Sequence, residues 1–321
     1  MDVVSLLAKI EQLQVKRADE ASYVLGNFTS GDWYYGLDEN NYLVFAVKSS
    51  TPNLLSTFQS TQKLIFTLNK KCHVSFPETK QELMHMLICT SQDETEKLAF
   101  LRLTAAFADM LPENGREGEL IKLFNSLSKL FSQNTPRSET DLQGFFAELY
   151  LILCFHDYDV LIHPYWQKKD KQKFDYSISA KKRLEVKSTL KESRIHVFNH
   201  EQLTADIYDI YVASVLLRED DRGISISDAV EMVREIAETD YETLKYIERF
   251  IKNVPQSDLD SLKYDEEYFR HNLRFVSAAD VPQFSERQPD GVTNIRYESD
   301  LTGAKYKTIE EIIPWIKDSE S

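Results

Sequence analysis

Two short segments, residues 174–179 and 183–187, most constrain how this 321-residue chain can fold, because apolar and polar residues alternate in both. The apolar positions are Phe174, Tyr176, Ile178, Leu184 and Val186. Successive side chains of a β-strand point to opposite faces of its sheet, and the few residues between the segments can turn the chain. We therefore expect an antiparallel strand pair whose polar side carries Asp175, Glu185 and Lys187.

Two carboxylates and an ammonium group on neighbouring strands indicate a site for a hard cation. Carboxylate oxygens are the ligands that Mg²⁺ prefers, and this ion keeps several water molecules and takes phosphate oxygens as further ligands. Glu-x-Lys triplets are common, and Glu78 and Lys80 form another one directly after a proline. That triplet has no alternating strand around it, so it is not a candidate.

A helix is expected to begin near Thr140, which fits a capping box together with Gln143. Its apolar residues recur at helical spacing, as in a helix that buries one stripe: Leu142, Phe145, Phe146, Leu149, Ile152 and Leu153. Glu148 lies at the flank of this stripe, where a carboxylate can face the edge of the core. Taken alone, Glu148 is an ordinary solvated glutamate.

Charge is unevenly spread along the chain. The formal net charge is −14, yet residues 161–200 contain ten cations and four anions, so this segment carries +6 and the rest carries −20. A basic patch on an acidic protein is typical of polyanion binding, although a solvated lysine-rich hairpin has the same pattern. The residues here that we expect to contact nucleic acid are Lys168, Lys169, Lys171, Lys173, Lys181, Lys182, Arg183, Lys191 and Arg194.

The chain divides by pattern into three parts, an α+β domain at 1–136, a core at 137–222 and a mainly helical C-terminal extension at 223–321. A polar linker containing a proline, residues 132–141, separates the first two. In the first part, residues 63–76 are expected to form a strand pair. Ser227 and Asp240 are expected to cap two helices of the third part.

The fold class expected is α/β (α+β), a mixed β-sheet core flanked by helices. Residues 209–220 form a nearly continuous apolar run, which is typical of a strand buried on both faces.

Several classes of protein are excluded or disfavoured. The three cysteines, Cys72, Cys89 and Cys154, are far apart and form no CxxC pair, which argues against a disulfide framework or a zinc site and fits a reducing cytoplasm. No apolar run approaches the length of a membrane span, and the N-terminus lacks the features of a signal peptide. No phosphate-binding P-loop is present, so ATP hydrolysis would need a partner.

An aspartate followed ten residues later by Glu-x-Lys, after a glutamate-bearing helix, resembles the PD-(D/E)xK phosphodiesterase superfamily and its restriction-endonuclease-like fold. Residues 142–203 resemble one of its families more closely, the domain of unknown function 4420. The segments that carry this resemblance are LQGFFAELYLI, YW, FDYSI, RLEVKST and IHVFNHEQL.

The resemblance implies catalytic roles for Glu148, Asp175, Glu185, Lys187 and Gln202. Asp175 and Glu185 would hold Mg²⁺ or Mn²⁺ with the backbone carbonyl of Val186, and Glu148 would hold a second metal or orient water.

The sequence departs from the family pattern at three places, and the last two concern substrate contacts more than metal binding. Phe174 replaces the usual proline, Ala147 replaces a common glycine, and the glycine expected after Trp166 is missing. Trp166 is expected either to pack in the core or to contact sugar or base. His196 is expected to have a structural or DNA-contacting role rather than to bind metal.

The function implied is a Mg²⁺-dependent DNA endonuclease of a prokaryotic restriction or anti-phage defence system, located in the cytoplasm. It would act on DNA with other subunits, such as an ATPase or methyltransferase encoded nearby, and its oligomeric state is left open. The alternative is a catalytically inactive or auxiliary subunit that binds DNA or protein. A small-molecule enzyme on an unrelated fold is a third class, favoured only by the acidic surface.

Overall fold

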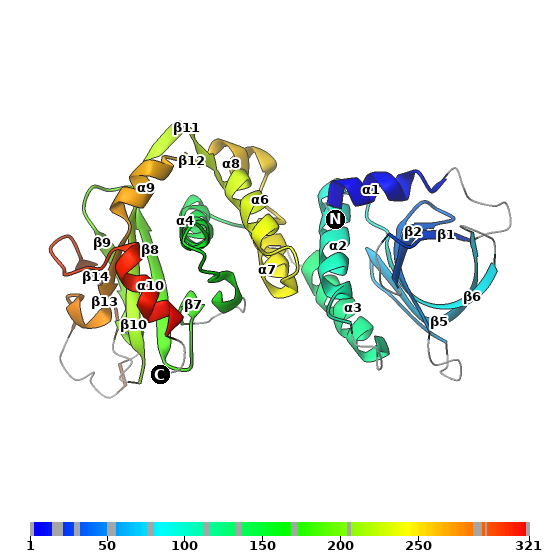
Figure 1. Cartoon of the computed structure of the whole chain (residues 1–321), viewed down its shortest axis with the longest axis horizontal. Helices are drawn as coiled ribbons and strands as arrows, with labels where there is room; N and C mark the ends of the chain where they lie inside the picture. Colours follow the sequence, from blue (N-terminus) through cyan, green and yellow to red (C-terminus); the bar gives the residue numbers. More distant parts are fainter. Residues whose placement is uncertain are drawn as a thin grey trace. The chain divides into compact units, whose positions relative to one another are not determined.

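The structure is a computed structural model in which the chain forms two compact units (Figure 1). Unit 1 contains Met1–Thr135 and Glu238–Lys252, and unit 2 contains Pro136–Ala237 and Asn253–Ser321. The residues that the structure describes are 3–14, 22–28, 33–49, 56–75, 80–111, 116–132, 136–167, 173–203, 207–284, 291–292 and 294–318. Within these ranges, no helix is both long and apolar enough to cross a bilayer.

The third part expected from the sequence is not a separate unit. Helix α7 (Tyr241–Ile251) belongs to unit 1, because Tyr241 and Leu244 are buried in its core. The rest of residues 223–321 belongs to unit 2 and includes a strand of its main sheet, β13 (Arg274–Ser277). The division at residue 222 was therefore wrong, because the residues that follow it are shared between unit 1 and unit 2.

Unit 1 contains a six-stranded sheet in the order β1-β2-β3-β6-β5-β4. The strands are β1 (Tyr23–Gly26), β2 (Trp33–Asp38), β3 (Leu43–Lys48), β4 (Thr57–Ser60), β5 (Leu64–Ser75) and β6 (Lys80–Cys89). Strand β1 also pairs in parallel with the end of β5, so the sheet curls back on itself. Gly36 permits the close approach of β2 and β1, since a Cβ there would lie 1.8 Å from the carbonyl oxygen of Val24.

Residues 63–76 do not form the strand pair expected from the sequence. They contain one long strand, β5, with a register shift between Thr67 and Lys70 in its pairing with β6. Asn69 lies at this irregularity with a φ of 49°, in the left-handed region that asparagine tolerates better than most residues. The polar residues at the centre of the segment therefore mark a bulge rather than a turn.

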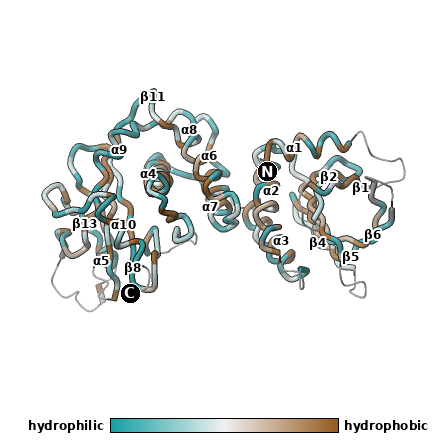
Figure 2. The backbone as a smooth tube through the Cα atoms, in the orientation of Figure 1, coloured by the Kyte–Doolittle hydropathy of each residue, from teal (hydrophilic) through white to brown (hydrophobic). Residues whose placement is uncertain are grey.

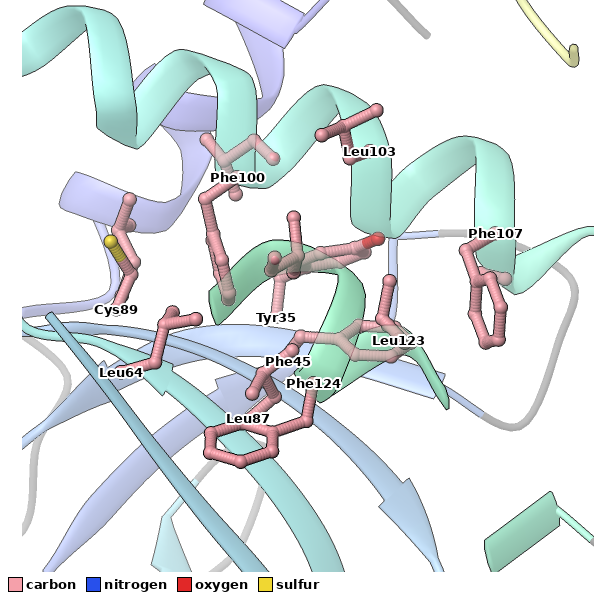
Figure 3. Packing of buried hydrophobic residues seen from close by; sticks show 14 of the residues in the cluster. Tyr35, Phe45, Leu64, Leu87, Cys89, Phe100, Leu103, Phe107, Leu123 and Phe124 are labelled. Carbon is pink, nitrogen blue, oxygen red and sulfur yellow. The ribbon is translucent and has the colours of Figure 1, made fainter. Parts of the chain in front are cut away.

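Helices α1 (Val3–Glu11), α2 (Glu94–Ala108) and α3 (Arg116–Ser132) pack against this sheet. Figure 3 shows α2 and α3 supplying Phe100 and Phe124 to the core, opposite Phe45 from the sheet. The rings of Phe66 and Phe124 are stacked, with centroids 5.3 Å apart. One continuous apolar cluster therefore joins these helices to the sheet.

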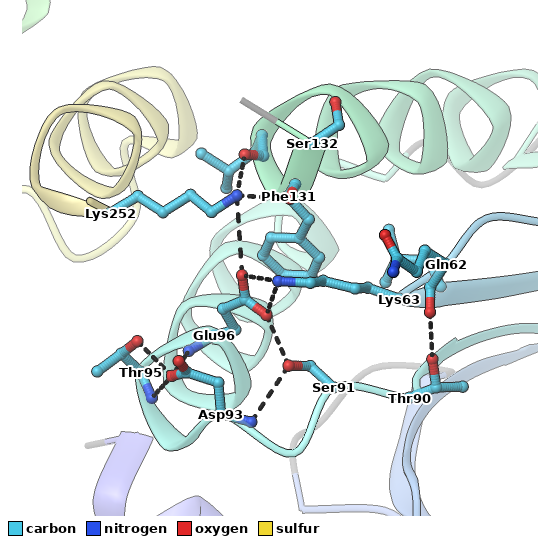
Figure 4. Close-up of polar contacts among 12 residues, drawn as sticks. Gln62, Lys63, Thr90, Ser91, Asp93, Thr95, Glu96, Phe131, Ser132 and Lys252 are labelled. Carbon is cyan, nitrogen blue, oxygen red and sulfur yellow. Dashed lines mark hydrogen bonds and ion pairs between the residues drawn. The ribbon is translucent and has the colours of Figure 1, made fainter. Parts of the chain in front are cut away.

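A polar cluster at the start of α2 joins α7 to the rest of unit 1 (Figure 4). Glu96 is buried and accepts hydrogen bonds from Lys63 Nζ at 2.6 Å and from Ser91 Oγ at 2.6 Å. Lys252 Nζ lies 3.7 Å from the same carboxylate and donates to the carbonyl of Leu130 in α3. A second ion pair links Arg102 of α2 to Glu248 of α7 at 2.6 Å.

Unit 2 is built around a four-stranded mixed sheet in the order β13-β10-β8-β7. Strands β8 (Lys182–Thr189) and β10 (Asp209–Leu216) are parallel, while β7 (Tyr176–Ser177) and β13 run antiparallel to their neighbours. The expected antiparallel pair is therefore present, with Tyr176 opposite Leu184. The buried strand expected at 209–220 is present as β10, which lies between two partners but ends at Leu216, and residues 219 and 220 begin the next strand.

The remaining elements of unit 2 are short strand pairs and helices. They include α4 (Glu139–His156), β9 (Ile195–Asn199), α5 (His200–Leu203), β11 (Glu219–Ser225), α6 (Ile226–Ile236), α8 (Gln256–Ser261), β12 (Lys263–Tyr264), α9 (Glu266–Asn272), β14 (Arg296–Asp300) and α10 (Ile309–Lys317). Helix α4 packs against β8 and α6, and its hydrophobic residues are prominent in Figure 2. Strand β9 pairs with β14, and β11 pairs with β12.

Two helix starts differ from those expected. The capping box of α4 is formed by Ser138 and Asp141, two residues before the predicted Thr140 and Gln143. Helix α6 is capped by Ser225 rather than Ser227, whereas Asp240 caps α7 as predicted. At both helix starts two serine or threonine residues lie close together, and either can act as the N-cap. The sequence alone does not show which of the two caps the helix.

We predict that Glu96→Ala destabilises unit 1 by about 3 kcal/mol, because it leaves the ammonium groups of Lys63 and Lys252 without their shared carboxylate. Chemical denaturation would measure the free energy of unfolding. The matched control is Glu94→Ala, since Glu94 is exposed and pairs with Lys97 within the same helix. This control is expected to cost less than about 1 kcal/mol, and equal losses in both variants would contradict the prediction.

Candidate active site

The residues singled out from the sequence meet where α4 approaches β7 and β8. Glu148 lies on α4, Asp175 immediately precedes β7, and Glu185 and Lys187 lie on β8. The hydroxyl of Tyr176 donates to the main-chain carbonyl of Glu148 at 2.8 Å, which ties α4 to β7. These elements therefore hold the site as one assembly.

Each carboxylate of the strand pair has a specific donor. The amide of Val186 donates to Asp175 Oδ2 at 2.7 Å. Glu185 Oε1 accepts from Lys187 Nζ at 2.6 Å and from Gln202 Nε2 at 2.6 Å. Glu185 and Lys187 share one face of β8 because alternate residues of a strand point the same way.

Gln202 reaches the site from the short helix α5. Its Nε2 also donates to the carbonyl of Lys173 at 3.2 Å, and its Oε1 accepts from the amide of Asn199 at 3.0 Å. These bonds fix the amide side chain between Glu185 and the segment that leads to Asp175.

The carboxylate of Glu148 is held by Trp166. The indole Nε1 donates to Glu148 Oε2 at 2.6 Å, and the Trp166 side chain is buried. Trp166 therefore supports the site from the core and does not contact sugar or base through an exposed ring. The packing role considered from the sequence was right, but the hydrogen bond was not foreseen.

Burial raises the pKa of all three carboxyl groups. For Glu148 and Glu185 the next cause is the negative charge of Asp175, while the Val186 amide partly offsets the rise in the pKa of Asp175. The pKa of Glu185 rises to about 8. Like charges brought together out of water resist ionisation, so a cation would relieve the strain of keeping them charged.

The donor set fits a divalent metal of the Mg²⁺ class. Glu185 Oε2 is buried and has no hydrogen-bond partner, so it is an acceptor oxygen available to a ligand. Among the described residues, no three His, Cys, Asp or Glu side chains are grouped closely enough to ligate a metal by themselves. Mg²⁺ suits such a site because it uses one or two carboxylates and keeps several water molecules.

The model of one protein family, described as a "Putative PD-(D/E)XK family member, (DUF4420)", matches residues 11–302. The chain belongs to this family. Comparison with curated proteins and with solved structures found no significant match. The resemblance predicted from residues 142–203 is confirmed, and the match extends across most of unit 1 as well.

Membership of the PD-(D/E)XK family agrees with the mixed α+β architecture and with a nuclease-like function. Glu148, Asp175, Glu185, Lys187 and Gln202 are the positions that carry the resemblance, and the structure brings all five into one site.

Two of the cations expected on the nucleic-acid surface are instead part of the fold. Lys182 is buried, and its Nζ donates to the carbonyls of Trp315 and Asp318 at the end of α10. Arg194 is buried and donates to the carbonyls of Ser214 at 2.8 Å and Asn272 at 2.5 Å. Because both cations satisfy carbonyl groups inside unit 2, these two assignments are corrected.

The other expected cations divide into three groups. Lys173, Lys181 and Lys191 are exposed, so their ammonium groups are open to a ligand. Arg183 is half-buried, stacks over the ring of Tyr208 at 4.2 Å and donates to nearby main-chain carbonyls. Lys168, Lys169 and Lys171 lie outside the described residues.

His196 is a structural residue of unit 2. It is buried, and its Nε2 lies 2.8 Å from the hydroxyl of Ser214, which also accepts from Arg194. Burial lowers its pKa to about 4, so the ring is neutral at physiological pH. Nothing in the sequence marked Ser214 as the partner, because it lies within the apolar run of β10.

The raised pKa of Glu185 predicts that metal-free protein loses stability as pH rises. Between the ordinary value of 4.5 and about 8, the folded state holds a proton that the unfolded chain has released. The free energy of unfolding therefore falls as pH rises through this window. The fall is about 1.4 kcal/mol for each pH unit between the unfolded and folded pKa values. Denaturation in the presence of a chelator should show a flatter pH profile for Glu185→Gln than for the wild type.

The control for this prediction is Glu192→Gln, which changes an exposed carboxylate in the loop after β8. Its pH profile is expected to match that of the wild type. If the profile of Glu185→Gln were as steep as that of the wild type, the pH dependence would not come from Glu185.

Proposed function

We propose that the protein is a metal-dependent endonuclease that hydrolyses phosphodiester bonds of DNA, with Mg²⁺ or Mn²⁺ as its cofactor. The observation that supports this most directly concerns Glu185, whose buried Oε2 has no hydrogen-bond partner. Its Oε1 accepts from Lys187, and the next amide along the chain, that of Val186, donates to Asp175. Family membership supports the same class of reaction.

Asp175, Glu185 and the carbonyl of Val186 are the groups that would hold the metal, with Glu148 as a further carboxylate. The bound cation would lower the pKa of a water molecule and offset negative charge on the phosphate. Gln202 keeps Glu185 turned into the site through its 2.6 Å bond.

Lys187 is the group of the site best placed to act on the reacting atoms. Its ammonium lies 2.6 Å from Glu185 Oε1, so it is held beside the carboxylate cluster. From there it would orient the attacking water or donate to the phosphate oxygen on which charge develops in the transition state.

The DNA backbone would be bound by Lys173, Lys181 and Lys191, which are exposed on the segment of the chain that also carries Asp175 and Glu185. Contacts to phosphates position a nucleic acid without reading its sequence. The basic segment thus concentrates positive charge where an acidic chain would otherwise repel DNA.

The setting we propose is a prokaryotic defence system in the cytoplasm, in which this chain acts with an ATPase or methyltransferase subunit. The family resemblance and the charge separation along the sequence support it. Purification from the native host would test it, since a lone chain without accompanying subunits would count against a complex.

We predict that the protein cuts supercoiled plasmid DNA in the presence of Mg²⁺ or Mn²⁺. Asp175→Ala, Glu185→Ala and Lys187→Ala are each expected to lower the cutting rate by about a thousandfold, which corresponds to about 4 kcal/mol of activation free energy. The matched controls are Glu201→Ala and Lys129→Ala, which change exposed residues outside the site. These controls should cut like the wild type.

No cutting by folded wild-type protein, with or without the products of neighbouring genes, would overturn the proposal and favour a binding subunit. Cutting that persists in all three site variants would place the reaction elsewhere in the chain.

We also predict that Lys173→Ala, Lys181→Ala and Lys191→Ala weaken DNA binding at all sequences and each reduce the slope of log affinity against log salt by about one. Fluorescence anisotropy over a salt series would measure both. Lys182→Ala is the contrasting variant, because the loss of its carbonyl contacts should lower the thermal midpoint. An unchanged salt slope in the three exposed variants would contradict their role.

A further inference from the structure

Trp166 makes a hydrogen bond that simple packing does not require. Its side chain is 3% exposed, and its Nε1 donates to Glu148 Oε2 at 2.6 Å. The indole nitrogen is only a donor, and hydrogen bonds to ionised carboxylates are among the strongest in proteins. The bond uses one oxygen of Glu148 and leaves the other for water or a cation.

The indole ring is itself held rigidly. It stacks between Phe145, with ring centroids 6.0 Å apart, and Tyr176, at 6.4 Å. Phe145 lies three residues before Glu148 on α4, so the same helix supplies both the carboxylate and one wall of the clamp. The main chain is fixed as well, since Trp166 forms a β-bridge with Tyr176 and the next amide, Gln167, donates to the carbonyl of Asp175 at 2.7 Å.

We propose that Trp166 is a positioning residue, whose indole N–H fixes the Glu148 carboxylate beside Asp175 and Glu185 and thereby increases the affinity of the site for a divalent cation. The proposal rests on the proposed function, because it concerns the same site.

The reason for such a device is the crowding of acidic groups. Without a cation between them, the rotatable side chain of Glu148 can turn away from Asp175 and Glu185. A fixed donor prevents this rotation before the metal arrives, so less order is lost on binding. Residues that hold metal-binding groups in place contribute about 10- to 100-fold to metal affinity.

The first test uses the indole signals of the wild-type protein. The chain contains three tryptophans, so a sample labelled with ¹⁵N at tryptophan gives three indole resonances. Trp315 is an internal control, because its Nε1 also donates to a carboxylate, Asp209 Oδ2 at 2.5 Å, but lies outside the cluster. Titration with Mg²⁺ is expected to shift the Trp166 resonance to saturation and to leave the Trp315 resonance unmoved. In Glu185→Ala, both resonances are expected to stay unmoved.

The second test compares Trp166→Phe with Trp315→Phe by calorimetric titration with Mn²⁺. Both variants keep an aromatic ring and remove an indole N–H that bonds a carboxylate, that of Glu148 in the first and that of Asp209 in the second. We expect affinity to fall at least about tenfold in Trp166→Phe and to change by less than about twofold in Trp315→Phe.

The outcomes separate this inference from the proposed function. Mn²⁺ affinity that is unchanged in Trp166→Phe, or reduced equally in both variants, would overturn the positioning role while leaving the metal site in place. A wild-type protein that binds no Mn²⁺ and shows no Mg²⁺-dependent shift would overturn the proposed metal chemistry and the inference with it. If Trp166→Phe does not fold, the wild-type titration still tests the inference, because a Trp166 resonance that Mg²⁺ leaves unmoved in a protein that binds Mn²⁺ would overturn it.

Discussion

Three carboxylates are brought together out of water at one end of the sheet in unit 2, and their mutual repulsion is the constraint to which the surrounding structure responds. Each has its own donor: the Val186 amide for Asp175, the indole for Glu148, and Lys187 with Gln202 for Glu185. These donors come from separate segments of the chain. The site therefore exists only when α4, β7, β8 and α5 are assembled together, and residues far from it in sequence serve to hold it.

Much of this arrangement could be predicted from local pattern. Strict alternation predicted the pairing of β7 with β8, and the apolar run predicted a central strand at β10, because both patterns follow from the two-residue period of a strand. The glutamate on α4 could be placed at the edge of the core from helical periodicity alone. The partner of Glu148 could not be predicted. Trp166 lies eighteen residues later, beyond the end of α4, and no local pattern connects its indole to this carboxylate.

The basic residues show where charge counting fails. Lys182 and Arg194 add the same formal charge to the basic segment as the exposed lysines do, yet both are buried against carbonyl groups. The acceptors of Lys182 lie at the end of α10, more than a hundred residues away. A cation used to complete the hydrogen bonds of a helix end cannot be distinguished in sequence from one that faces solvent. The division of the chain into units was also beyond the sequence. The amphipathic pattern of α7 shows that one face of the helix is buried, but it does not show which unit covers that face.

The placement of α7 in unit 1 affects how the protein is made. Residues 1–135 emerge from the ribosome without the helix that covers Phe107 in their core, and that helix is complete only at residue 251. At about 5–20 residues per second, this interval lasts on the order of ten seconds. During that time the apolar surface of α2 and α3 that faces α7 in the finished unit is open to chaperones or to aggregation. The first unit of the chain to be synthesised is thus completed only after much of the second has left the ribosome.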